Sequence, residues 1–240
     1  MEPQRIGIGR AFSWFGAGWR NFRAQPAQWI ALILLYVVLL LVLNLVPVLG
    51  GLLGTVLTPA LGAGLLLGAQ SGARGDPVRL DHLFAGLTDS RTRLPLLLLG
   101  GLALATTFLL AALYLSMADA LPAPGAPAHE APFALESGLG GLLVLVLGLV
   151  AVLAFYFAAP LVVFAALGIP AALGTSLRAA ARNLLPIALF GLVYALLAVP
   201  AAIPFGLGFL VLGPVGIAAT YAAFTEIFPG PPGTEAGHSA

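Results

Sequence analysis

The chain has 240 residues, of which 60% are hydrophobic and only 8% are charged, and its mean hydropathy is +1.06 with a formal net charge of +1. Since an ordinary soluble domain is about 25% charged, so few charges could not cover the surface of a soluble protein of this size. The composition therefore excludes the soluble classes and indicates an integral membrane protein.

The first predicted element is an amphipathic helix ahead of the first apolar run. Phe12, Phe15, Trp19 and Phe22 recur at helical spacing, so they predict one apolar stripe flanked by arginines. Such a helix lies in the headgroup plane of a membrane or packs on the end of its own bundle, and the sequence leaves both open. We assign residues 1–25 to this cytoplasmic segment. The apolar run behind it exceeds signal-peptide length, which predicts a retained span.

Six charge-free apolar segments follow, each near the roughly 20 residues that a helix needs to cross a bilayer. The expected spans are residues 27–45, 48–70, 94–118, 138–167, 186–203 and 205–228. The fourth is too long for a straight crossing, so its Pro160 predicts a kink or a strong tilt.

These spans predict an all-α fold, a polytopic membrane helix bundle. We expect six transmembrane helices in three hairpins, with short amphipathic cytoplasmic helices between the hairpins. The membrane domain is expected to cover residues 26–228, and residues 229–240 are expected to form a disordered cytoplasmic tail.

The hairpins read as three copies of one unit. "RNF" at residues 20–22 has a counterpart in "RNL" at residues 182–184, and each second span carries one proline among small residues. These prolines are Pro59, Pro160 and Pro214. Chance similarity within Leu/Ala/Gly-rich sequence is the alternative interpretation.

The segments between hairpins share a G-x-P-x-x-L pattern that begins at Gly75 and at Gly168. In the first of them, Asp76 is expected to cap the helix with Pro77 at its first position. In the second, Pro170 takes the corresponding place. Both segments are therefore predicted to form short helices like the one that precedes the first span.

All ten basic residues are arginines, and none lies in the loops after spans one, three and five. The positive-inside rule makes the arginine-bearing side cytoplasmic and places both termini there, which predicts a multi-pass protein of the bacterial inner membrane. Because the arginines are few and lie next to the ends of the spans, we expect membrane lipids and no nucleic acid as partners. A protein partner and a homo-oligomer stay open. The candidate lipid-headgroup or interface residues are Arg10, Trp19, Arg20, Phe22, Arg23, Arg79, Arg178 and Arg182. The alternative is that the arginines only determine topology.

The sequence contains no pattern that indicates a chemical reaction. No span has an ionisable residue in its interior, and Glu226 at the exit of the sixth is expected to be solvated. The histidines lack zinc-site spacing, and the chain has no cysteine. We therefore predict no catalytic residue, no metal and no cofactor. The expected packing and kink positions are Gly50, Gly54, Gly64, Gly68, Pro59, Pro160 and Pro214.

Several motifs together are similar to those of a known family. "GWRNFRAQPAQW", "LTPALGAGL", "RGDPVRLDHLFAGL", "RNLLP" and "YAAFTEIF" resemble an uncharacterised family of bacterial integral membrane proteins of about this length, over nearly the whole chain up to Phe228. The organisation is also loosely similar to the membrane domain found beside glycerophosphodiester phosphodiesterases. The resemblance implies an inner-membrane location and six spans, and it implies no catalytic residue.

Two functions remain open on the sequence. The first is a non-enzymatic, lipid-interacting or scaffold component of the cell envelope. The second is a small transporter or permease for a small or lipidic solute. The second predicts a mid-membrane cavity where Pro59, Pro160 and Pro214 meet, lined by Thr58 and tyrosines.

The arginine distribution makes a prediction about topology. Green fluorescent protein fused after Ala240 should fluoresce in bacteria, because that end is expected to be cytoplasmic. Alkaline phosphatase fused at the same point should be inactive. The reverse pattern would contradict the proposed orientation.

Overall fold

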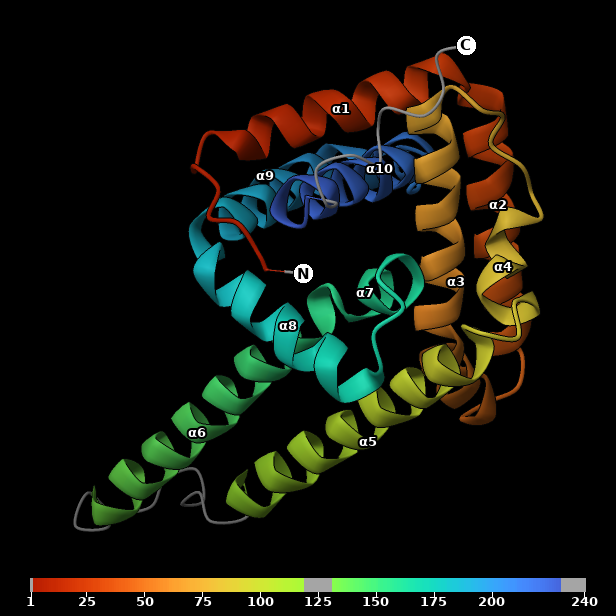
Figure 1. Cartoon of the computed structure of the whole chain (residues 1–240). Coiled ribbons are helices and arrows are strands. Elements are labelled where there is room, and N and C mark those ends of the chain that lie inside the picture. The colour runs from red at the N-terminus through yellow and green to blue at the C-terminus, as the bar shows by residue number, and fades with distance from the viewer. Residues whose placement is uncertain (1, 119–130, 230–240) are drawn as a thin grey trace.

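The computed structural model describes residues 2–118 and 131–229, so most of the loop expected between the third and fourth spans, and most of the expected tail, lie outside the described residues. Within the described residues the regular elements are helices (Figure 1). Six helices or helix pairs are long and apolar enough to cross a membrane, as predicted. They are α2 (Pro26–Asn44), α3 (Leu49–Arg74), α5 (Arg93–Ala118), α6 (Ala131–Tyr156) with α7 (Ala158–Phe164), α9 (Leu184–Ala202) and α10 (Phe209–Ile227).

A short helix precedes each of the three hairpins. These helices are α1 (Arg10–Ala24), α4 (His82–Thr88) and α8 (Ile169–Arg182). Each one packs against the second span of the preceding unit: α4 against α3, α8 against α6 and α7, and α1 against α10 (Figure 1). The contact between α1 and α10 joins the first unit to the third and closes the molecule into a ring.

Ring closure divides the spans into inner and outer helices. About half of the apolar stretch of α3 and of α10 is buried, against 17% in α2 and α5. The place where α3, α7 and α10 meet is filled by side chains of one buried cluster that includes Ala60, Phe157 and Phe224. The ring centroids of Phe157 and Phe224 lie 6.2 Å apart. The first spans of the hairpins and α6 carry most of the apolar exterior instead, because the fourth span is also only 17% buried.

The fourth span is broken at Phe157, close to the predicted kink, because Pro160 has no N–H to donate to the carbonyl one turn earlier. Ser176 of α8 satisfies the backbone groups at this break. Its hydroxyl donates to the Leu153 carbonyl and accepts the Phe157 N–H, both at 2.9 Å. Since bilayer interiors offer no water to free backbone groups, this buried serine stabilises the break. Pro59 and Pro214 lie inside uninterrupted helices.

Glycines mark the closest helix contacts. A Cβ at Gly64 would collide with the His82 and Leu83 carbonyl oxygens of α4, and one at Gly50 would collide with Leu43 across the α2–α3 turn. A Cβ at Gly68 would lie 3.3 Å from the Leu32 side chain of α2, which is a tight contact. Gly54 is buried but would have room for a Cβ. The small residues of α3 thus let α4 approach its backbone.

The second short helix begins later than predicted. Asp76 and Pro77 precede α4, whose first residue is His82. The reason is local: Gly75 ends α3 in the left-handed conformation, and the Asp76 N–H donates to the Ser71 carbonyl. The Gln25 side chain then holds the segment, donating to the Asp76 carbonyl and accepting from the Val78 N–H, both at 2.8 Å.

The close approach of α5 to α3 gives a test of the packing. A Cβ on Gly100 would collide with the Val56 carbonyl of α3, whereas one on its neighbour Gly101 meets nothing within 4 Å. Gly100→Val should destabilise the protein by about 1–3 kcal/mol, as overpacking typically does. Thermal unfolding in detergent should show a lower midpoint for Gly100→Val and little change for Gly101→Val. Equal midpoints would contradict the described α3–α5 contact.

Candidate functional site

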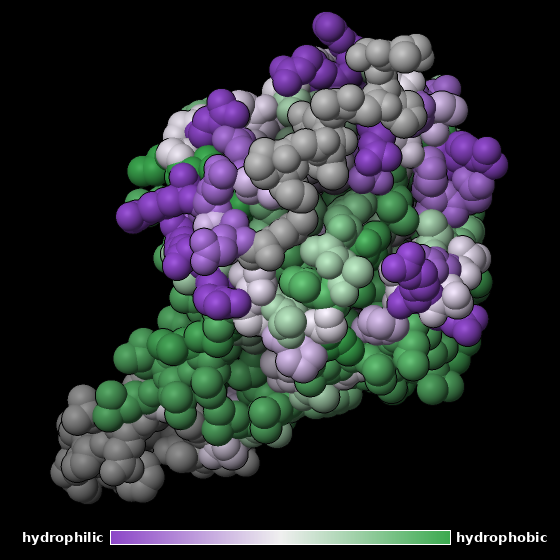
Figure 2. Space-filling view, in the orientation of Figure 1, coloured by the Kyte–Doolittle hydropathy of each residue, from purple (hydrophilic) through white to green (hydrophobic). Residues whose placement is uncertain are grey.

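All ten arginines are exposed, and topology places them at the same ends of the spans, on or beside the short helices. We call this region the arginine end. Hydrophilic side chains gather over α1, α4 and α8, while the α5–α6 hairpin is covered by hydrophobic side chains (Figure 2).

Glu226 fixes α1 to the end of α10. Its Oε2 accepts a hydrogen bond of 2.7 Å from the indole N–H of Trp14, and its Oε1 pairs with the Arg10 guanidinium. The hydrogen bond and the charge of Glu226 raise the pKa of Arg10 above its ordinary value. The expectation that Glu226 is solvated is therefore wrong, and only 24% of its side chain is exposed.

The buried face of α1 differs from the predicted aromatic stripe. The buried residues are Ala11, Trp14, Gly18, Asn21 and Phe22. Phe22 is 6% exposed and packs in the protein core, so the expectation that it faces lipid is wrong. Phe12 and Trp19 remain exposed. The physical reason is Gly18, where a Cβ would collide with the Val215 carbonyl of α10, so the small-residue face lies inward.

Asn21 and Asn183 are buried polar residues, and sequence analysis did not assign them a role. The Asn21 amide donates to the Ala69 carbonyl at 2.9 Å and accepts from the Trp29 indole at 3.1 Å, joining α1, α2 and α3. Asn183 accepts from the Ile6 N–H at 2.7 Å and donates to the Gln4 carbonyl at 2.9 Å. Both asparagines belong to the repeated "RN" pair, and this repeat is the sequence signal that could have indicated their shared role.

The remaining candidate arginines have different surroundings. Arg79 pairs with Asp81 at 2.8 Å, and the hydrogen bond from this guanidinium lowers the pKa of the Asp81 carboxyl. Arg178 lies along its own helix and donates to the Gly174 carbonyl. Among the described residues, Arg20, Arg23 and Arg182 have no carboxylate within ion-pair distance.

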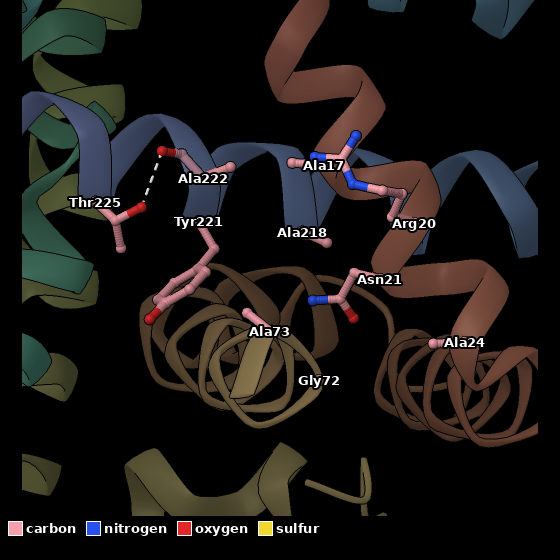
Figure 3. Close-up of a pocket in the computed structure, with 10 residues that line it drawn as sticks. All are labelled: Ala17, Arg20, Asn21, Ala24, Gly72, Ala73, Ala218, Tyr221, Ala222 and Thr225. Carbon is pink, nitrogen blue, oxygen red and sulfur yellow. Dashed lines mark hydrogen bonds between the residues drawn. The ribbon is translucent and has the colours of Figure 1, made fainter. Parts of the chain in front are cut away.

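A cavity of about 310 Å³ lies where α1, α3 and α10 meet (Figure 3). Arg20 and Asn21 reach it from α1, and Tyr221 and Thr225 reach it from α10. The other lining residues are small: Ala17, Ala24, Gly72, Ala73, Ala218 and Ala222. We call it the α1–α3–α10 pocket.

A second cavity of about 640 Å³ lies between α5 and α6 and has mostly apolar walls. Thr106 and Thr107 lie on its α5 side, and each hydroxyl donates to a carbonyl one turn earlier in the same helix. Such bonds within one helix are a usual structural role of threonine in a membrane span. Thr58, expected to line a cavity between the three prolines, is exposed and bonds the Gly54 carbonyl. No proline lines either of the two cavities described here.

Comparison with known proteins identifies no relative: no protein-family model, curated protein or solved structure matches the chain. Within the described residues, no group of histidine, aspartate and glutamate side chains could hold a metal ion. The features of the molecule that bear on function are therefore the arginine end and its pocket.

The buried Asn183 amide makes a prediction about the N-terminal segment. Asn183→Ala leaves the Ile6 N–H without its acceptor, and such losses cost about 1–3 kcal/mol. Hydrogen–deuterium exchange of residues 2–9 should become faster and the unfolding midpoint should fall. Asn44→Ala is the matched control, because exposed Asn44 bonds only the Leu40 carbonyl of its own helix. Unchanged exchange in Asn183→Ala would contradict the described contact.

Proposed function

We propose that this protein is a non-enzymatic integral protein of the bacterial inner membrane that binds anionic lipid headgroups at its arginine end. It acts as a lipid-interacting or scaffold component of the cell envelope, with both termini in the cytoplasm. The observation that supports this proposal is the clustering of exposed arginines at one end of six apolar spans.

The arginines of α1 and α8 are the strongest candidates for lipid contact. Arg20 and Arg23 lie in the last turns of α1, and Arg178 and Arg182 occupy the corresponding part of α8. All four are exposed, whereas Arg10 and Arg79 are already paired with carboxylates of this chain. Guanidinium groups at the headgroup level attract anionic lipid by about 1 kcal/mol each.

Exposed apolar side chains next to these arginines support the same proposal. Phe12 and Trp19 project from α1 rather than into the core, with 60% and 47% of their surface exposed. An aromatic ring beside arginines is typical of a helix that contacts the membrane interface. The helix thus packs on α10 with one face and presents aromatic and basic groups on another.

Lipid preference of the purified protein tests this function. In neutral detergent, native mass spectrometry should show retained phosphatidylglycerol in preference to phosphatidylcholine. Replacing Arg20, Arg23, Arg178 and Arg182 by glutamine should reduce that preference about tenfold or more, from the charge attraction lost. The control is Arg91→Gln with Arg93→Gln, two exposed arginines at the start of α5 and outside α1 and α8. Equal retention of both lipids by the unmodified protein would contradict the proposal.

A further inference from the structure

We propose that the α1–α3–α10 pocket binds a phosphate group, held by Arg20 at its mouth. This inference rests on the proposed function, because it names the chemical group that the arginine end recognises and the place where it is bound. The pocket joins the first short helix, the second span of the same unit and the last span, so a bound group would contact all three elements that close the ring.

The polar groups of the pocket are suited to an anion. Arg20 carries a planar guanidinium whose paired N–H donors match the oxygens of phosphate. Its side chain runs along α1 beside Ala17, and the Tyr221 and Thr225 side chains lie on the α10 side (Figure 3). The Tyr221 hydroxyl can donate a hydrogen bond to such a group, whereas the Thr225 hydroxyl already donates to the Ala222 carbonyl at 3.0 Å and would have to exchange that bond. The lining contains no acidic residue that would repel an anion.

The neighbouring acidic residue is already engaged. Glu226 follows Thr225 directly, but both of its oxygens are bound by Arg10 and Trp14. The Asn21 amide is likewise held by Ala69 and Trp29, so it forms a fixed wall. Arg20 is thus the one cationic group of the lining, and no carboxylate of the described residues neutralises it.

The size and floor of the pocket limit the ligand. A volume of about 310 Å³ is at the small end for ligand cavities, so the pocket accepts a headgroup and not a whole lipid. Alanines and a glycine form most of its floor, so an apolar part next to the phosphate is tolerated. A phosphomonoester on glycerol fits this chemistry, whether it belongs to a lipid or to a soluble phosphate ester.

The test uses the full-length protein in neutral detergent with short-chain phosphatidic acid as the probe. Arg20→Gln should weaken binding about tenfold, because a charge-assisted hydrogen bond is lost. Ala73→Phe should abolish binding by filling the pocket from an exposed position that leaves buried packing unchanged. The matched controls are Arg91→Gln, outside the lining, which should weaken binding much less than Arg20→Gln, and Ala181→Phe at an exposed position of α8, which should bind as the unmodified protein does.

The possible outcomes distinguish failure of the pocket inference from failure of the proposed lipid-binding function. If all four variants bind phosphatidic acid like the unmodified protein, the pocket inference is overturned while lipid binding by the arginine end stands. If the unmodified protein binds phosphatidylcholine as well as phosphatidic acid, the proposed function and the inference both fail. If glycerol phosphate competes at equal concentration, the phosphate chemistry is supported and the lipid as its source is overturned.

Discussion

The contact between α1 and α10 is the constraint on which the arrangement of the other helices depends. It is the most extensive of the contacts that join the first unit of the chain to the third, which also include those of α10 with α2 and α3, and it converts a row of three hairpins into a ring. Gly18 allows the backbones to meet, and Glu226 binds Trp14 and Arg10 at the end of the contact. Closure places α3, α7 and α10 in the interior of the ring and brings the arginines to the same end of the helix bundle.

The buried polar residues have a related role. Ser176 satisfies the backbone at the break in the fourth span, Asn21 links α1 to α2 and α3, and Asn183 holds the N-terminal segment. Helices in lipid gain little from apolar burial alone, so close packing and satisfied hydrogen bonds determine which helices pair. These residues thus specify the pairing that the abundant leucines leave open.

The spans could be predicted because each depends on a local property, the length of an uninterrupted apolar run. The same is true of the three short helices, whose helical spacing lies within one segment. The inward face of α1 could not be predicted in this way, since the aromatic stripe points partly outward while Gly18 and Trp14 face α10. The Trp14 indole donates its hydrogen bond to Glu226, 212 residues away in the chain, and no local sequence pattern indicates that pair. The pocket was missed for the same reason, because its walls come from three distant helices.

Ring closure through the α1–α10 contact can be tested by cross-linking, because the chain has no native cysteines. Ala17 of α1 and Ala222 of α10 line the same pocket. Both alanines are replaced by cysteine, and a short bifunctional thiol reagent is applied to native membranes. The reagent should join the two cysteines within one chain, and the yield of this link should not depend on expression level. Tandem mass spectrometry of the digested protein would identify the linked peptides. Labelling of both cysteines without any intramolecular link would contradict the closed ring.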